Sequence, residues 1–527
     1  MSQIKLNPEN VGDEKALRKS LNKALANALK VSGRKLPEIS NIEIIKESID
    51  ARKKPAVKLI YTVDFDCEQE LPIDKAVPRK YDLEANVRRL GADLDTLSKE
   101  GSRPVVAGFG PCGMFAGLIL AQAGLRPIVI ERGKPVDERI KDVEEFWAKA
   151  ALGSGSDAVP DPESNVQFGE GGAGTFSDGK LTTGIKDVRI RKVMEEFVAA
   201  GADKSILYKH RPHLGTDKLR DIVKNIRLEI EKLGGEVDFS TRLDEIHTVN
   251  SDGNLKLKEI VTSDGRVIET DHLILATGHS ARDTFKMLLD SGVIMEPKPF
   301  SIGVRIEHPQ SMINRVQYGD EKIAEYVGAA DYKLNHKCQS GRGVYTFCMC
   351  PGGYVINAST EPGTMVTNGM SNSGRDSEFA NSALLVDVKT TDFDDPLDPL
   401  SGIEFQRRYE KLAFNNRAKT TYGKFKADPK DPVRQSLPGF AYESMIEAMP
   451  YLGKKLKGFD SDDSIMTGVE TRSSSPVRIP RGESMESNIR GLYPAGEGPG
   501  HAGGIMSAAV DGIKAAEAVI REKCQSI

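Results

Sequence analysis

Cysteine is scarce in this sequence of 527 residues. The six cysteines are Cys67, Cys112, Cys338, Cys348, Cys350 and Cys524. None of them forms a C-x-x-C pair, whereas disulfide-rich domains and zinc ribbons carry cysteines at short, regular spacings. We therefore expect neither a disulfide framework nor a structural zinc site, and no metal among the functional groups.

An excess of charge of one sign is absent as well. The chain holds 73 basic against 77 acidic residues, a net charge of −4, so nonspecific binding to nucleic acid or to an anionic membrane is not expected. The most apolar stretch, residues 114–130, contains Gln122, Gly124, Arg126 and Pro127 and does not suit the roughly 30 Å of hydrocarbon in a bilayer. The first 20 residues show no apolar core with a cleavage site, and we expect a cytoplasmic protein.

The order of strand-like and helical patterns predicts an α/β protein of several domains. The expected domains are a small N-terminal α+β domain at 1–98, a Rossmann-like dinucleotide-binding domain at 99–290 and 466–527, and an inserted α+β substrate or cap domain at 291–465. The first should end in a helix near residues 82–97. The second should combine a parallel sheet with a β-meander, because its alternating segments are separated by the turn sequences NSDGN and SDGR.

A glycine-rich turn carries the clearest chemistry. Gly108, Gly110 and Gly113 form G-x-G-x-x-G directly after an apolar strand and at the start of a helix. These glycines allow a tight turn, close approach of a pyrophosphate and close helix packing, and the helix N-terminus stabilises the phosphates. Eighteen residues further on, Glu131 ends a second strand. Its carboxylate is expected to accept hydrogen bonds from both hydroxyls of a ribose that lacks a 2′-phosphate.

A second glycine-rich segment, residues 169–181, reads GEGGAGTFSDGKL. Such a loop suits a polyanionic cofactor, with Gly174 and Thr175 as hydrogen-bond donors and Lys180 aimed at a phosphate or an acidic substrate. A flexible surface loop would explain the same density of glycine.

The fingerprint followed by Glu131 and Arg132, together with LILATGHS and GLYPAGEGPGHAGGIMSAAVDG, resembles the glutathione-reductase-type FAD superfamily. A closer similarity, carried by the segment at 169–181, ATGHSARD and GPGHAGG, is to a bacterial family of uncharacterised FAD-dependent dehydrogenases. The resemblance implies that the dinucleotide-binding domain binds FAD, closed by the A-T-G at 276–278 and by an acidic residue, here Glu497. Many relatives carry Asp at that position. It implies a flavoprotein oxidoreductase but supplies no substrate.

The fingerprint and this resemblance together give a set of expected cofactor contacts. They are Gly108, Gly110, Pro111, Cys112, Gly113, Glu131, Arg132, Gly174, Thr175, Leu243, Ala276, Thr277, Gly278, Gly496, Glu497, Gly503, Gly504 and Ile505. The last three open the C-terminal helix, whose N-terminus would place partial positive charge near the flavin and stabilise its reduced form. Cys112 is expected to act as a small packing residue.

Candidate catalytic groups are His501, Lys180 and Arg305. His501 lies within the C-terminal glycine turn, and because histidine side chains in general titrate near neutral pH, it could relay a proton or make a structural hydrogen bond. Lys180 and Arg305 are candidate ligands for an acidic substrate, although a surface salt bridge would explain each of them. Cys348 and Cys350, as C-x-C in a strand, are expected to be structural thiols on one face.

No second G-x-G-x-x-G follows a strand between residues 130 and 490. A separate nicotinamide domain is therefore not expected, and NAD(P)H, if it is the donor, must bind transiently. The main hypothesis is a dehydrogenase that moves a hydride between a small molecule and FAD. The alternatives are a flavin monooxygenase that uses NAD(P)H and O2, and a flavin-containing RNA-modification or scaffold protein. The oligomeric state stays open.

Overall fold

The computed structural model describes residues 1–29, 36–67, 71, 81–89, 91, 93–94, 97, 101–151, 158–251 and 253–525. Within these residues, a five-stranded parallel sheet has the order β21-β10-β4-β5-β6. Its strands are β4 (Val105–Ala107), β5 (Ile128–Ile130), β6 (Glu236–Asp238), β10 (Leu273–Leu275) and β21 (Leu492–Pro494). The first three belong to one βαβ arrangement and its continuation, as the glycine fingerprint predicts.

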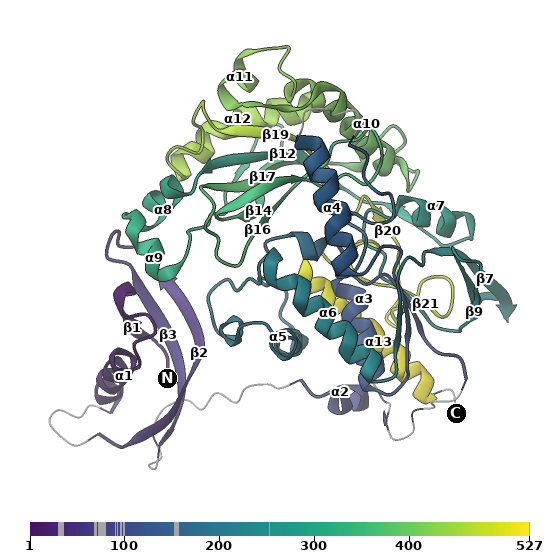
Figure 1. Cartoon of the computed structure of the whole chain (residues 1–527), viewed down its shortest axis with the longest axis horizontal. Coiled ribbons are helices and arrows are strands. Elements are labelled where there is room, and N and C mark those ends of the chain that lie inside the picture. Colours follow the sequence, from purple (N-terminus) through teal and green to yellow (C-terminus); the bar gives the residue numbers. More distant parts are fainter. Residues whose placement is uncertain are drawn as a thin grey trace.

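Alternating side chains of these short strands enter two different cores. Val106, Val129 and Ile274 pack with the helices on one face, whereas Val105 and Ala107 pack against the opposite layer, because successive residues of a strand point to opposite faces. The first layer holds α3 (Pro111–Gln122), α5 (Arg189–Ala199), α6 (Thr216–Lys232) and α13 (Ile505–Gln525), with α4 (Val136–Ala151) beside α6 (Figure 1).

The opposite layer is an antiparallel meander with one helix. It contains β7 (Leu243–Ser251), β8 (Asn254–Thr262), β9 (Val267–Glu269) and α7 (Arg282–Asp290). A parallel sheet with helices on one face and a meander on the other is the Rossmann-like α/β class predicted from the sequence, and this prediction is confirmed. We call this region, residues 101–299 and 471–525, the parallel-sheet part.

The inserted region is built on a six-stranded antiparallel sheet of order β13-β14-β17-β12-β19-β18. Its strands are β12 (Phe300–Pro309), β13 (Asn335–Lys337), β14 (Gly343–Cys350), β17 (Phe379–Val388), β18 (Lys419–Thr421) and β19 (Ile465–Glu470). We call residues 300–470 the cap part. The expected boundary between 465 and 466 falls inside β19, because the sheet keeps this strand paired with β12 up to Glu470.

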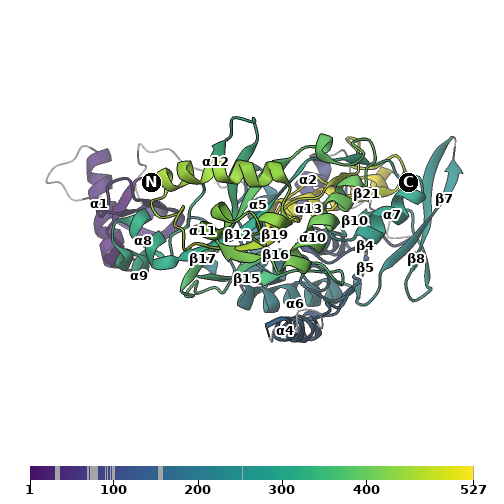
Figure 2. The same cartoon turned by 90° about the horizontal axis from the view of Figure 1, so that it is seen from above.

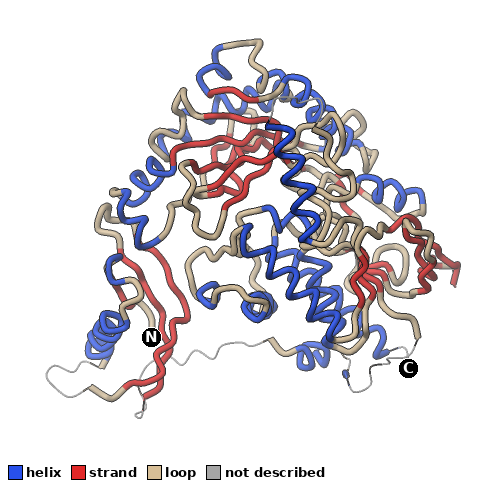
Figure 3. The backbone as a smooth tube through the Cα atoms, viewed as in Figure 1, coloured by secondary structure: helices blue, strands red, loops and turns tan. Residues whose placement is uncertain are grey.

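Helices cover this sheet on the side away from the parallel-sheet part (Figures 1 and 3), namely α10 (Ser401–Asn416), α11 (Tyr422–Ala427) and α12 (Gly439–Lys455). Helices α8 (Gln310–Tyr318) and α9 (Ala324–Val327) lie at the end of the cap part next to the N-terminal unit. Figure 2 shows α12 lying across the cap strands, where Met445, Ala448 and Leu452 enter the cap core. A small ribbon of β15 (Gly353–Asn357) with β16 (Thr367–Ser371) completes the cap part, and a second ribbon, β11 (Glu296–Pro297) with β20 (Val477–Arg478), belongs to the parallel-sheet part.

The N-terminal region is a separate small α+β unit. Strands β1 (Ile4–Leu6), β3 (Lys58–Cys67) and β2 (Ile39–Asp50) form a three-stranded sheet in that order. Helix α1 (Glu14–Ala28) packs Leu21 and Leu25 onto it. The unit lies beside α8 and α9 (Figure 1), where Lys54 donates to the Val316 carbonyl at 2.5 Å.

The helix expected near residues 82–97 is shorter and lies elsewhere. It is α2 (Leu83–Arg89), and Val87 packs into the core around α3 and α13. Tyr81 donates to Glu517 of α13 at 2.9 Å. The segment therefore belongs to the parallel-sheet part rather than to the N-terminal unit, because its apolar face matches α13. Residues 90, 92, 95 and 96 of the expected helix lie outside the described residues.

A buried charge network joins the two large parts. Glu410 of α10 has no exposed surface and accepts from Arg282 of α7 at 2.7 and 3.0 Å and from Arg472 at 3.0 and 3.1 Å. These two cations hold the pKa of the Glu410 carboxyl well below its usual range, against the opposing effect of burial. Among the described residues no helix combines the length and the apolar composition needed to cross a membrane.

Glu410→Gln should destabilise the protein by about 3 kcal/mol or more, because it removes the carboxylate shared by two buried guanidinium groups and leaves Glu361 as the remaining partner of Arg282. Glu404→Gln on the same helix is the matched control: the Glu404 side chain is 61% exposed in its pair with Arg407, and such pairs contribute about 1 kcal/mol or less. Thermal and urea unfolding of both variants measures the difference. Equal effects would contradict the bridging role of Glu410.

Candidate functional site

One cavity extends between the carboxyl ends of β4 and β10 and the underside of the cap sheet. At one end it is lined by Arg132 and Arg242, in its middle by the glycine turn, and at the other end by Lys180 and Cys348. The carboxyl ends of parallel strands are the usual ligand position in open α/β sheets. The cavity therefore coincides with the place that the fingerprint predicts.

Each of the three glycines of the fingerprint is required for a different structural reason. Gly108 has φ +103°, and a Cβ there would lie 2.5 Å from the Ala276 carbonyl oxygen. A Cβ at Gly113 would lie 1.8 Å from the Gly108 oxygen, so α3 can begin at this point only without a side chain. At Gly110 the nearest atom to such a Cβ is 3.8 Å away, on Gly172. Gly110 and Pro111 line the cavity, whereas Gly113 serves helix packing.

Glu131 lines the cavity at the end of β5, but its carboxylate is already extensively hydrogen-bonded. It accepts backbone N–H groups of Phe109 at 2.7 Å, Gly133 at 2.9 Å and Gly169 at 2.8 Å. A carboxylate offers about four acceptor sites. One site therefore remains for a ribose hydroxyl, instead of the two that the sequence suggests.

The neighbouring end of the cavity carries two arginines. Arg132 pairs with Glu163 at 2.7 Å and Asp283 at 2.8 Å, and these carboxylates raise its pKa although burial opposes them. Its guanidinium also lies 4.3 Å from the centre of the Phe168 ring. Leu243, at the start of β7, lines the same end. This end therefore has a neutralised, partly apolar wall.

The A-T-G segment after β10 supplies the opposite wall, with Ala276, Thr277 and Gly278 all on the cavity. The Thr277 hydroxyl oxygen is buried and has no hydrogen-bond partner in the described part of the chain. Buried polar groups without partners are rare in folded proteins. The orphaned hydroxyl is thus consistent with a polar ligand in this cavity.

The C-terminal turn places Glu497, Gly504 and Ile505 on the cavity. Burial raises the pKa of Glu497 to about 7, and His279 Nε2 lies 3.9 Å from its carboxylate. Burial, together with nearby arginines, lowers the pKa of His279 to about 3. Helix α13 begins at Ile505, so its positive end faces the cavity.

Other expected contacts of this turn have structural roles. Gly496 does not line the cavity, and a Cβ there would meet the Cys112 Cβ at 2.8 Å. Cys112 reaches the cavity wall but is 4% exposed and packed against α13, in agreement with its expected packing role. Gly503 is exposed next to Gly504 and outside the lining.

In the loop at 169–181, Gly174 and Lys180 line the cavity and Thr175 does not. The Thr175 hydroxyl donates to the Glu170 carbonyl at 3.0 Å, and its own carbonyl accepts from Thr216 at 2.7 Å. Thr175 therefore fixes the loop. The alternative of a flexible surface loop is not supported, because much of this segment is buried.

Two of the three candidate catalytic groups lie away from the cavity. Arg305 has no exposed surface, and all five of its N–H donors have protein acceptors, among them Glu470 and Asn368. It is not available to a substrate, and that expectation is corrected. His501 Nε2 lies 2.9 Å from the Ile479 carbonyl oxygen and outside the cavity lining; its ring makes the structural hydrogen bond.

The cap sheet, the β15–β16 ribbon and Arg472, which follows β19, contribute cavity residues to which sequence reasoning assigned no such role. They are Phe347, Cys348, Cys350, Thr367, Asn368, Gly369, Glu470 and Arg472. Cys348 departs from the expected regular strand, because the register of β14 shifts between Phe347 and Cys350 and its φ is +41°. Only the C-x-C pattern marked this segment in the sequence; Asn368 and Glu470 carried no local signal.

Comparison with known proteins shows the family to which the chain belongs. The family described as FAD-dependent protein, C-terminal domain-like, matches residues 299–431 in the cap part, and a domain of unknown function (DUF8436) matches residues 1–66. An uncharacterised protein of Clostridium beijerinckii is 46% identical over 514 residues, which cover 92% of this chain and 93% of that protein. The chain belongs to this family of FAD-dependent proteins.

Solved structures show partial likeness to this FAD-dependent family member. Glycine oxidase from Bacillus cereus is 12% identical with a TM-score of 0.32, over 80% of this chain and 96% of that chain. A variant of NikD, an unusual amino acid oxidase essential for nikkomycin biosynthesis, is 12% identical with a TM-score of 0.34, over 80% and 94%. CtdE in complex with FAD is 12% identical with a TM-score of 0.30, over 81% and 88%.

The raised pKa of Glu497 gives this FAD-dependent protein a pH-dependent stability when it is free of flavin. The folded state binds a proton that the unfolded state has released between about pH 4.5 and about 7, so the stabilisation from Glu497 is lost as the pH rises through that window. Glu497→Gln should remove the loss. Unfolding of the flavin-free protein is measured across this pH range, and the free energy of unfolding of Glu497→Gln should increase relative to wild type as the pH rises. The control Glu483→Gln, at an exposed position, should show the same pH dependence as wild type.

Proposed function

We propose that this protein is an FAD-dependent dehydrogenase that moves a hydride between a small acidic molecule and FAD. The observation that carries the proposal is the single cavity in which the glycine fingerprint, the A-T-G segment and the start of α13 meet the cap sheet. The first three segments offer backbone donors to a dinucleotide, and the cap sheet forms the wall against which a second molecule would bind.

The residues of the cavity fit FAD in three respects. Gly110 lines the cavity at the N-terminus of α3, with no atom closer than 3.8 Å to a hypothetical Cβ, and the free N–H groups of the helix would bind the pyrophosphate there. Glu131 keeps one acceptor site for the ribose. Thr277 carries an unpaired buried hydroxyl, and at Gly504 no atom lies within 4 Å of a hypothetical Cβ, so a planar ring can approach the backbone.

Bound FAD would supply the hydride acceptor or donor, and the chain would supply orientation, charge and exclusion of water. The positive end of α13 would stabilise negative charge that develops near it. Glu497, with its pKa near neutrality, can hold or release a proton at the same place. The cap sheet would cover the reacting face and keep bulk water from it.

Lys180 is the group that favours an acidic substrate. The other charged side chains at its end of the cavity are paired, as Asp178 is with Arg375, Glu470 with Arg305 and Arg472 with Glu410. In the described part of the chain Lys180 forms no ion pair, and its amine donates to the backbone carbonyl of Met349. This end therefore carries one positive charge that a substrate carboxylate can neutralise.

NAD(P)H is the electron donor that we propose to test first. Because no second G-x-G-x-x-G follows a strand between residues 130 and 490, NAD(P)H would enter the same cavity transiently. Neither nucleic acid nor a membrane is part of the proposal, since the charge balance of −4 favours neither.

Gly110→Val tests the cofactor site. The Cβ would lie 3.8 Å from the Gly172 Cα, an ordinary contact, at a position that lines the cavity, so the variant should fold but lose most of its bound flavin, measured as flavin absorbance per protein chain. Gly184→Val is the control, because Gly184 is exposed and a Cβ there meets nothing within 4 Å. A folded Gly110→Val variant that keeps its full flavin content would contradict the assignment of the pyrophosphate site.

Lys180→Met tests the substrate site while keeping the length of the side chain. Wild-type protein is mixed anaerobically with NADH, NADPH and a panel of carboxylic and neutral metabolites, and bleaching of the flavin band is followed. For the acidic compounds that react, the variant should lower the second-order rate constant at least about tenfold, corresponding to about 1.4 kcal/mol of lost binding.

Lys186→Met, at an exposed position nearby, should leave this rate unchanged. A uniform loss with acidic and neutral compounds would contradict the role of Lys180 in substrate charge recognition. Rapid NADPH oxidation with release of hydrogen peroxide in air would favour a monooxygenase over the proposed dehydrogenase.

A further inference from the structure

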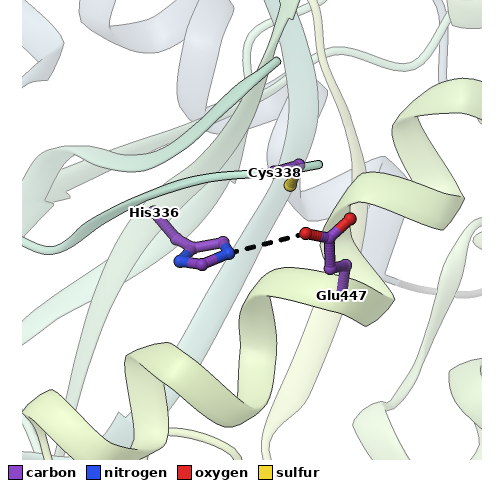
Figure 4. A group of neighbouring side chains, drawn as sticks. All are labelled: His336, Cys338 and Glu447. Atoms are coloured by element: carbon purple, nitrogen blue, oxygen red, sulfur yellow. Dashed lines mark ion pairs between the residues drawn. The ribbon is translucent and has the colours of Figure 1, made fainter. Parts of the chain in front are cut away.

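A group of metal-ligating side chains lies in the cap part, away from the cavity. His336 in β13, Cys338 just after it and Glu447 in α12 offer one ligand atom each, and these atoms lie within 4.8 Å of one another. Figure 4 shows the imidazole, the sulfur and the carboxylate facing a common point. We call this group the His336–Cys338–Glu447 cluster. None of its residues lines the cofactor cavity.

Local structure explains why these side chains meet. His336 and Cys338 are two positions apart at the edge of the cap sheet, so both point to the same face. Helix α12 covers that face and presents Glu447 to them. Three different chemical groups from an edge strand and from a distant helix therefore converge on one point.

The distances suit coordination better than a direct hydrogen bond. His336 Nε2 and Glu447 Oε1 are 3.7 Å apart, beyond the usual limit for an N–H to oxygen bond. Two ligands held roughly 2.0 to 2.2 Å from a tetrahedral zinc ion are separated by roughly 3.4 Å. By contrast, His247 on the exposed meander lies 2.9 and 3.0 Å from its two carboxylates, as in ordinary hydrogen-bonded pairs.

Neighbouring groups hold the three side chains in place. The His336 ring stacks on Tyr451 with a centroid distance of 4.1 Å and an interplanar angle of 9°. Glu447 Oε1 accepts from the Gln339 backbone at 2.8 Å. Cys338 is 4% exposed, and its thiol lies 3.4 Å from the Ser444 carbonyl. Such second interactions orient the ligands of a metal site before the metal arrives.

We propose that the His336–Cys338–Glu447 cluster binds a zinc ion. Sulfur, imidazole nitrogen and carboxylate oxygen together match a borderline-soft cation, whereas magnesium and calcium prefer oxygen ligands alone. Three protein ligands leave a fourth tetrahedral position for water. The Cys338 thiol releases its proton to solvent when the ion binds, and the ion cross-links β13, at the edge of the sheet, to α12.

This site revises the expectation of no metal, which rested on the missing C-x-x-C pair. The spacing His336-x-Cys338 is too short to stand out, and the third ligand follows more than 100 residues later. Because the cluster lies outside the cofactor cavity, zinc would stabilise the cap part without taking part in hydride transfer.

The test uses the full chain with its flavin retained. Protein treated with a chelator and dialysed is titrated with Zn²⁺, and bound zinc is measured by elemental analysis and calorimetry. Cobalt replaces zinc in a second titration, because a thiolate ligand and tetrahedral geometry give intense ligand-field bands at wavelengths longer than those of flavin absorption. Variants Cys338→Ser, Glu447→Gln and His336→Gln are compared with Cys67→Ser and His247→Gln.

The expected result is one zinc ion per chain, a higher unfolding temperature with zinc, and a loss of affinity of at least about 100-fold in each of the three cluster variants. The two control variants should bind as wild type does. The proposal is overturned if wild type binds less than one equivalent, if cobalt gives only the weak bands of an octahedral site, or if Glu447→Gln and His336→Gln bind normally. Should Cys338→Ser fail to fold, the other two variants decide. Flavin content and turnover are measured on the same samples, and they test the proposed dehydrogenase function independently of zinc binding.

Discussion

The contact between Gly113 and the Gly108 carbonyl is the constraint on which the rest of the structure depends. A Cβ at residue 113 would lie 1.8 Å from that oxygen, so the start of α3 can fold back onto the end of β4 only because the side chain is absent. This close approach directs the first N–H groups of α3 toward the carboxyl end of the sheet. Every later segment of the cavity is positioned relative to that turn.

Further glycines bring distant parts of the chain onto the same turn. A Cβ at Gly512 of α13 would meet the Cys112 oxygen at 2.0 Å, and one at Gly498 would meet the Gly278 oxygen at 2.5 Å. The C-terminal helix is thus packed backbone to backbone against α3, and the C-terminal turn against the A-T-G segment, which itself approaches Gly108 through the Ala276 carbonyl. These close approaches shape the cavity.

Local sequence signals predicted those parts of the fold in which neighbours along the chain decide the structure. The strand, glycine turn, helix and second strand around Gly110 are of this kind, as is the helix that begins at Ile505. Helix α2 was expected in the N-terminal domain but belongs to the parallel-sheet part. Its apolar stripe indicates that one face is buried but does not indicate which element it packs against. The same limit applies to β19, whose pairing with β12 carries the cap sheet past the expected boundary.

Side-chain roles were predictable only where the backbone fixes them. Glu131 follows a strand and reaches the cavity, yet its three backbone donors come partly from the loop near Gly169, which no local pattern relates to it. Arg305 illustrates the opposite outcome, since an arginine in an apolar strand suggested a substrate ligand. In the folded chain its side-chain partners Glu470, Asn381 and Asn368 come from three other strands or ribbons, and together with the Cys348 carbonyl they accept from all its donors.

The buried ion pairs of the cap explain why a single lysine can determine the charge of the substrate end. Arg305 neutralises Glu470, and the two carboxylates of Glu410 and Glu361 neutralise Arg282 and Arg472, so each desolvated charge there has a partner, as burial requires. Lys180 enters from the glycine-rich loop of the other part, and in the described structure it meets only a backbone carbonyl of β14. A carbonyl dipole compensates a cation only in part. The remaining positive potential faces the cavity beside Cys348 and Asn368, where a carboxylate would complete the charge balance that the fold maintains elsewhere.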